Sequence, residues 1–128
     1  MQTVILMGLV FLMAAQVHAT TKTFYLKHDG LTRKYAINLP KSYSGKTPVP
    51  LVVYIHGGGG NAQSAFDDGM GDSSESLGFI LAAPEAMNGA WNGGTWDSGT
   101  CCGINDDTGF IREMLKQIER NYKIDMPL

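Results

Sequence analysis

The chain has 128 residues, of which 44% are hydrophobic and 17% are charged, and its formal net charge at pH 7 is −2. This length and composition predict one globular domain. The slightly negative charge gives no basic surface of the kind that binds nucleic acid or an anionic membrane, so we expect neither as a partner.

The N-terminal segment has the pattern of a signal peptide. Residues 4–15 are apolar, and Val17, His18 and Ala19 place short side chains where a signal peptidase reads them. Because a helix needs about 20 apolar residues to cross a bilayer, this shorter run favours a cleaved signal over a membrane span. We therefore expect residues 1–19 to be removed, leaving residues 20–128 as a secreted protein, extracellular or periplasmic.

The first part of the mature chain favours an antiparallel hairpin. Residues 24–27 and 32–39 alternate between apolar and polar side chains, and Asp29-Gly30 between them is a turn signal. Pro40 ends the second strand. After a loop, residues 51–55 form an uninterrupted apolar run, which is typical of a strand buried on both faces of a parallel sheet.

The rest of the chain alternates helix and strand. We expect a helix near residues 73–77 with Gly78 as its stop, and a strand over 79–83 ended by Pro84. A long loop of residues 85–105 precedes a helix over 108–121, and residues 122–128 lead towards another strand. The helix carries an apolar stripe: Phe110, Ile111, Met114, Leu115 and Ile118. The pattern predicts an α/β fold whose sheet is incomplete.

Four glycines and a histidine follow the apolar run of residues 51–55. Without Cβ atoms, these glycines allow the backbone to turn sharply and approach a ligand. In α/β-hydrolases, a His-Gly-Gly-Gly segment after an early strand supplies one amide of the oxyanion hole. We take the amide of Gly58 as the first candidate, with Gly57 and Gly59 as neighbours that could replace it. The alternative is a tight turn that binds nothing.

No residue of this chain is assigned as a catalytic nucleophile, acid or base. A Gly-x-Ser-x-Gly elbow is missing, since residues 71–75 lack the final glycine. We interpret His56 as a residue that braces the glycine turn by hydrogen bonding, and His28 as a surface residue. Asp106 and Asp107 resemble paired catalytic carboxylates, but their place before an apolar helix favours capping.

The long loop of residues 85–105 carries both tryptophans. Loops of this length within a compact domain are usually functional. Trp91, Asn92 and Trp96 are therefore candidates to line a cleft for a sugar or an aromatic acyl group. The alternative is that at least one tryptophan covers the edge of the core.

The acidic and cysteine residues give no metal or cofactor site. Asp67, Asp68, Asp72 and Glu75 have no metal-binding spacing, so we interpret them as a solvated face and expect neither metal nor cofactor. Cys101 and Cys102 are adjacent, and a bond between them would close a strained ring. They are candidates for disulfides to partners beyond Leu128, or otherwise free thiols; a redox role lacks the Cys-x-x-Cys pattern.

An ordered set of short motifs resembles a known family. These are Leu39-Pro40, Pro50–Val53, His56–Asn61, Gly78–Ile80, Pro84, Trp91-Asn92, Cys101–Gly103, Asp106–Ile111 and Tyr122–Asp125. Together they resemble the N-terminal half of the polyhydroxybutyrate depolymerase and feruloyl esterase family of secreted α/β-hydrolases, over nearly all of the mature chain.

The resemblance implies acyl transfer. A serine attacks an ester carbonyl, a histidine moves the proton, a carboxylate orients that histidine, and two amides stabilise the oxyanion. In the family the elbow serine follows the Tyr-x-Ile-Asp segment, and the acid and histidine come later. This sequence stops before all three, so we interpret it as a partial esterase domain, truncated before the nucleophile elbow and inactive alone.

The expected substrate is a polymeric or polysaccharide-linked carboxylic ester, of the polyhydroxyalkanoate or feruloyl type. The alternative functions are a short non-catalytic secreted binding module or pseudo-enzyme that uses the Trp/Asn-rich loop, and a small thiol protein. For the truncated domain we also expect one unpaired edge of the strand at residues 51–55, exposed Phe110, Met114 and Ile118 on the last helix, and a tendency to aggregate.

Overall fold

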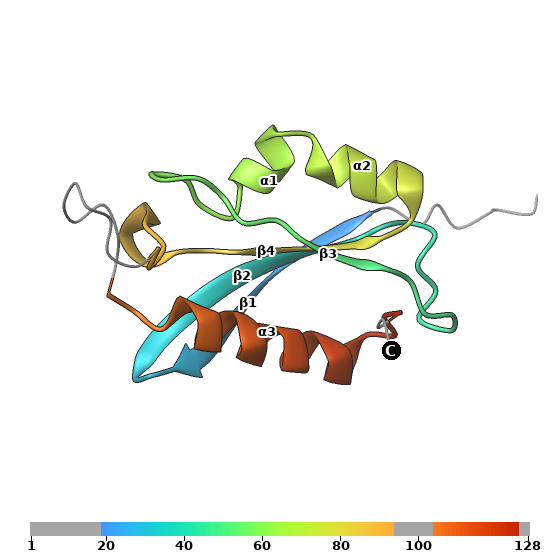
Figure 1. The fold of residues 1–128 in the computed structure, drawn as a ribbon. Coiled ribbons are helices and arrows are strands. Elements are labelled where there is room, and N and C mark those ends of the chain that lie inside the picture. Colours follow the sequence, from blue (N-terminus) through green and yellow to red (C-terminus); the bar gives the residue numbers. More distant parts are fainter. Residues whose placement is uncertain (1–18, 94–103, 126–128) are drawn as a thin grey trace, which may run out of the picture.

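A computed structural model describes residues 19–93 and 104–125, in which a sheet of four strands lies between two layers of helix (Figure 1). The strands are β1 (Thr20–His28), β2 (Leu31–Leu39), β3 (Leu51–Val53) and β4 (Ile80–Pro84). Helices α1 (Ser64–Asp67) and α2 (Met70–Leu77) cover one face, and α3 (Asp107–Asn121) covers the other. No helix in these two ranges is both long and apolar enough to cross a membrane.

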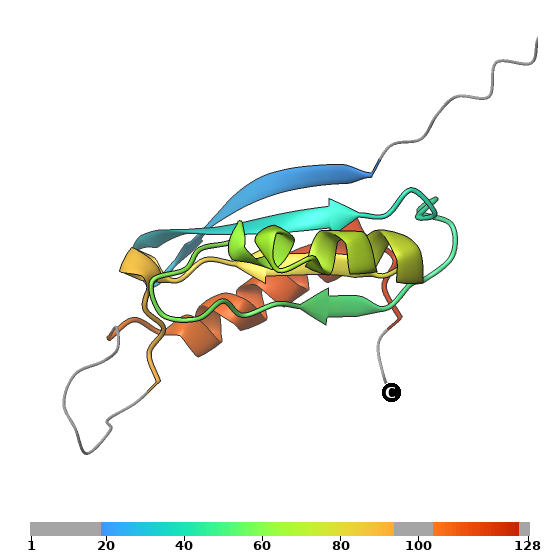
Figure 2. The same cartoon turned by 90° about the horizontal axis from the view of Figure 1, so that it is seen from above.

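The strand order is β1-β2-β4-β3, as Figure 2 shows from above. The predicted hairpin is confirmed: β1 and β2 are antiparallel, and Asp29 and Gly30 at its turn have φ of 49° and 74°. Such positive φ angles suit the right-handed twist of a two-residue hairpin turn. Strand β4 pairs antiparallel with β2 and parallel with β3, which leaves β3 at the edge of the sheet that the structure describes.

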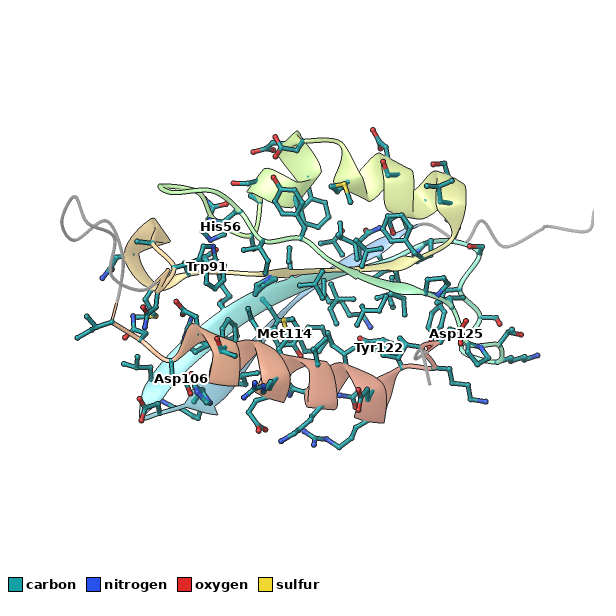
Figure 3. The ribbon with its side chains drawn as sticks, in the orientation of Figure 1. His56, Trp91, Asp106, Met114, Tyr122 and Asp125 are labelled. Atoms are coloured by element: carbon teal, nitrogen blue, oxygen red, sulfur yellow. The ribbon has the colours of Figure 1, made fainter. Side chains whose placement is uncertain are left out.

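The larger core lies between the sheet and α3. Tyr35 and Ile37 of β2 and Ile80 of β4 face the stripe of α3, and Figure 3 shows Met114 in this layer. The expectation that Phe110, Met114 and Ile118 would be exposed is wrong, because each has a relative exposed area of 0%. The two central strands, β2 and β4, already provide the apolar surface that α3 needs.

The opposite face packs smaller side chains under α1 and α2. Its buried apolar residues are Ala36, Ala62, Ala65, Phe79, Leu81 and Ala83. The helix expected near residues 73–77 is confirmed but begins earlier, at Met70, and α1 precedes it. The predicted stop at Gly78 is also confirmed, since this residue has a φ of 76° and caps α2 in the left-handed region.

The segments beside the carboxyl ends of β3 and β4 also differ from the prediction. The strand expected over residues 51–55 ends at Val53; the amide of Tyr54 still donates to the Ala82 carbonyl at 2.9 Å, but Ile55 is already exposed. The loop expected over residues 85–105 contains a short 3₁₀ turn, η1 (Met87–Gly89). An Asn-Gly pair readily adopts positive φ angles, and here Asn88 and Gly89 have φ of 54° and 73°.

The segment after α3 returns to the edge of the sheet. Ile124 forms a parallel bridge with Val49, and the Asp125 amide donates to the Val49 carbonyl at 2.8 Å. This agrees with the prediction that residues after 121 lead towards a further strand. The new pairing lies on the β3 side of the sheet.

Candidate oxyanion site

Two loops and the start of α3 meet at one end of the sheet. Because β3 and β4 are parallel, the residues that follow them emerge at the same edge. Figure 3 shows His56, Trp91 and Asp106 at this end, with Tyr122 and Asp125 at the other. In open α/β sheets, ligands bind outside the carboxyl ends of the strands. This end is therefore where a functional site is expected.

His56 fixes the start of the glycine-rich loop, which comprises residues 56–60. Its ring is buried, with a relative exposed area of 2%. The Ala86 amide donates to Nε2 at 3.1 Å, so Nε2 is an acceptor, and Nδ1 donates to the Gly57 carbonyl at 2.7 Å. Both ring nitrogens are occupied by the backbone. The prediction that His56 braces the glycine turn by hydrogen bonding is confirmed.

The amides of the four glycines differ in what they contact. The Gly59 amide donates to the Gly89 carbonyl at 2.8 Å, and the Gly60 amide donates to the Gly57 carbonyl at 3.1 Å. Gly57 and Gly58 are exposed, and within the described ranges their amides donate no hydrogen bond. Of the three candidate donors, Gly57 and Gly58 therefore have amides open to a ligand, while Gly59 uses its own to hold the loop.

Backbone conformation and close neighbours explain why positions 59 and 60 of the loop are glycines. Gly59 has a φ of 78°, which side chains rarely adopt. A Cβ on Gly60 would lie 2.9 Å from Ser64 Oγ and 3.0 Å from His56 Nδ1. At Gly57 and Gly58, by contrast, a Cβ would meet nothing within 4 Å. The space beside these two residues is open.

Trp91 packs against the glycine-rich loop. Its indole Nε1 donates to the His56 carbonyl at 2.9 Å, and the two rings lie 5.0 Å apart between centroids. The half-buried ring also packs against the α3-side core. These contacts match the alternative that Trp91 covers the edge of the core. Trp96, Cys101 and Cys102 lie outside the described residues, so their predicted roles stay predictions.

Asn92 and Asp107 join the long loop to α3. The Asn92 amide donates to Asp107 Oδ2 at 2.6 Å, and its side-chain amide donates to the Asn105 carbonyl at 3.0 Å. The Asn92 side chain remains exposed. Of the predicted cleft residues, the structure therefore places Trp91 against the glycine-rich loop and Asn92 at the start of α3.

A buried ion pair lies beneath this junction, and the sequence interpretation missed it. Arg33 Nη2 donates to Asp107 Oδ1 at 2.6 Å, with side-chain exposures of 1% and 8%. The guanidinium also lies 4.0 Å from the ring centroid of Phe110. The sequence did contain a signal for this pair. Side chains alternate between the two faces of a strand, so Arg33 lies on the same inward face of β2 as Tyr35 and Ile37, and a buried charge there requires a partner.

The two acidic residues at the start of α3 have different roles. Asp106 caps the helix, as predicted, by accepting from the Gly109 amide at 2.9 Å. That bond and the one from His28 hold the pKa of Asp106 below its usual value. Interpreting His28 as only a surface residue was wrong: its Nε2 lies 2.9 Å from Asp106 Oδ2. The long separation in sequence hid this pair.

Glu85 ties the end of β4 to the segment before α1. Its Oε1 lies 2.8 Å from Lys34 Nζ, and its Oε2 accepts from the Ala62 amide at 3.1 Å. Burial alone would raise the pKa of Glu85, but these two hydrogen bonds lower it below its usual value. The carboxylate therefore stays charged as a structural link.

The acidic cluster on the α1–α2 side is a solvated face, as interpreted. Asp67, Asp68 and Asp72 are exposed. Gln63 donates to Asp67, Tyr54 to Asp68, and the Lys41 amide to Glu75.

Known proteins share this architecture. No family model matches the chain. Feruloyl esterase B of Piromyces equi is 30% identical over 95 residues, which are 73% of this chain and 17% of that protein. An S-formylglutathione hydrolase from Agrobacterium tumefaciens has a TM-score of 0.63 at 15% identity, over 88% of this chain and 48% of its own. A ferulic acid esterase has a TM-score of 0.62 at 22% identity, over 87% and 46%.

A ferulic acid esterase from Anaeromyces mucronatus, solved with ferulic acid, is also similar, with a TM-score of 0.56 at 21% identity over 84% of this chain and 44% of its own. The chain thus spans less than half of these solved structures. The predicted fold, an N-terminal portion of an α/β-hydrolase with an incomplete sheet, is confirmed. The predicted resemblance to feruloyl esterases is confirmed as well.

Proposed function

We propose, from its α/β-hydrolase fold and its similarity to a feruloyl esterase, that this chain supplies the oxyanion loop of a carboxylic-ester hydrolase. The observation that carries the proposal is the pair of open amides at Gly57 and Gly58. They follow β3 at the carboxyl edge of the sheet, in a loop held by His56 and by the Gly59–Gly89 hydrogen bond.

The chemistry follows from the fixed position of these amides. When a nucleophile attacks an ester, the carbonyl oxygen becomes an oxyanion, and a donor already in place stabilises it without reorganising. One such donor contributes about 2.7–4 kcal/mol to transition-state stabilisation. We assign Gly58 as the first donor, with Gly57 beside it.

The nucleophile has to come from outside residues 1–128, since this sequence has no Gly-x-Ser-x-Gly elbow. By this proposal the chain alone is inactive, and the complete enzyme cleaves a polymeric or polysaccharide-linked ester outside the cytoplasm. Feruloyl-polysaccharide esters are the first substrate to test, because the relatives include a feruloyl esterase and an esterase solved with ferulic acid.

The decisive test replaces Gly58 in the longest protein that the gene encodes. Gly58→Pro removes the amide proton, so kcat for methyl ferulate should fall by about 10²-fold or more. Gly58→Ala is the matched control: it keeps the amide, and its Cβ meets nothing within 4 Å. An unchanged kcat in Gly58→Pro would place the oxyanion donor elsewhere.

A second test uses residues 20–128 alone. We expect no hydrolysis of p-nitrophenyl acetate above a buffer control and no labelling by a fluorophosphonate, which modifies activated serines. Turnover that disappears on changing a serine of this chain would contradict the assignment of the nucleophile to a region outside it.

A further inference from the structure

The Arg33–Asp107 ion pair is connected by hydrogen bonds to the long loop beside the candidate oxyanion site. The two carboxylate oxygens of Asp107 accept from different segments: Oδ1 accepts from Arg33 of β2, and Oδ2 accepts from the Asn92 amide, each at 2.6 Å. Arg33 Nη2 also lies 3.5 Å from the Glu85 carbonyl at the end of β4. One side chain at the start of α3 therefore joins the sheet to the loop of residues 85–93.

That loop in turn holds the glycine-rich loop. The Trp91 indole donates to the His56 carbonyl at 2.9 Å, and the Gly89 carbonyl accepts from the Gly59 amide at 2.8 Å. The Ala86 amide donates to His56 Nε2 at 3.1 Å. These contacts lie on both sides of Gly57 and Gly58, so the position of their amides depends on the position of residues 86–92.

The cost of burying the pair indicates a role beyond stability. Removing two charges from water is expensive, and well-packed apolar residues often stabilise a core as well or better. Arg33 adds to this cost, because within the described ranges its buried Nε has no hydrogen-bond partner. An apolar residue at position 107, however, could not accept the Asn92 amide. The carboxylate supplies geometry that an apolar core would lack.

We infer that Asp107, oriented by Arg33, is a positioning residue that sets the oxyanion loop through residues 86–92. This inference rests on the proposed function. Because oxyanion donors act mainly in the transition state, loss of this positioning should lower kcat and leave KM nearly unchanged.

The first test measures loop order without reference to catalysis. Asp107→Asn keeps the side-chain shape but removes the charge that pairs with Arg33. In the longest protein that the gene encodes, hydrogen exchange at the Gly59 amide and the Trp91 indole should accelerate by about tenfold or more. Both proteins are measured well below their melting temperatures, and the indole signal that disappears in a Trp91→Phe variant is assigned to Trp91.

The matched control is Tyr35→Phe. It removes the 2.7 Å hydrogen bond from Tyr35 to Gln117, which also joins β2 to α3 but lies away from the glycine-rich loop. Exchange at the Gly59 amide and the Trp91 indole should match wild type. If Tyr35→Phe accelerated exchange as much as Asp107→Asn, general destabilisation would explain both, and the inference would be overturned.

The second test measures kcat and KM for methyl ferulate. We expect Asp107→Asn and Arg33→Met each to lower kcat by about tenfold or more, with KM within about twofold of wild type. The double variant should be no worse than Asp107→Asn, since residues acting through one network are not additive.

The outcomes separate this inference from the proposed function. If Asp107→Asn lowered the melting temperature but left kcat and the hydrogen-exchange rates at the Gly59 amide and the Trp91 indole at wild-type values, the Arg33–Asp107 pair would have only a structural role. If Gly58→Pro retained wild-type kcat, the proposed function would fail. In that case the exchange rates would still decide whether Asp107 holds the loop.

Discussion

The two faces of the sheet are covered in different ways. The α3 face is filled by large side chains, including Tyr35, Ile37, Phe110 and Met114. The opposite face is filled mainly by alanines, and it buries a polar link in which Asn38 donates to Ser74, and Ser74 to the Phe79 carbonyl. Large buried side chains therefore attach α3 to the sheet, whereas α2 is attached by small side chains and by buried hydrogen bonds.

The two helices also begin differently. Helix α3 has a side-chain cap at Asp106, while the N-cap residue of α2 is Gly69, which has a φ of 78° and forms no side-chain cap bond. Helix α3 is thus anchored by its cap, by the ion pair of Asp107 and by its apolar stripe. We expect substitutions on the α3 face to have the larger effects on stability.

The largest expected effect follows from emptying the α3 face. Phe110 is fully buried and carries Arg33 over its ring, so Phe110→Ala should lower the free energy of unfolding by about 3–5 kcal/mol. Urea denaturation measures it. Ile111, half-buried on the same helix, is the control, and Ile111→Ala should cost clearly less. Equal losses at both positions would mean that volume does not dominate this face.

A smaller effect is expected from the opposite face. Ser74→Ala leaves both the Asn38 side chain and the Phe79 carbonyl without their buried partner, which should cost about 1–3 kcal/mol. Ser76→Ala is the control on the same helix, since Ser76 is exposed and its change should stay within about 0.5 kcal/mol. A loss at Ser74 as large as that at Phe110 would remove the contrast between the faces.

The smallest effect concerns the cap of α3. Because the pKa of Asp106 is lowered on folding, its contribution is present above the unfolded pKa and is lost as pH falls through the folded pKa. Asn also caps helices but does not titrate. Between about pH 5 and about pH 2, wild type should therefore lose more thermal stability than Asp106→Asn. If the melting temperatures of wild type and Asp106→Asn fell equally over this pH range, the charge of Asp106 would not contribute to the stability of α3.

Local patterns in the sequence determined much of the architecture. Asp29-Gly30 predicted its hairpin because these residues tolerate positive φ. The apolar period predicted α3 to within one residue of its start, and the pair Asp106 and Asp107 before it predicted a capping residue, which is Asp106. The apolar run of residues 51–55 and the four glycines that follow His56 predicted a turn at the edge of the sheet. Each of these signals depends on neighbouring residues or on a short repeat.

Only the tertiary structure decided which groups meet. His28 and Asp106 are 78 positions apart, and Arg33 and Asp107 are 74 apart, so no local pattern could pair them. The strand order β1-β2-β4-β3 places β2 and β4 beneath α3, which is why Phe110 is buried. The same folding brings Gly89 to Gly59, leaving the amides of Gly57 and Gly58 open. The sequence by itself determined that a glycine loop would follow β3; contacts between distant segments decided which of its amides a ligand can reach.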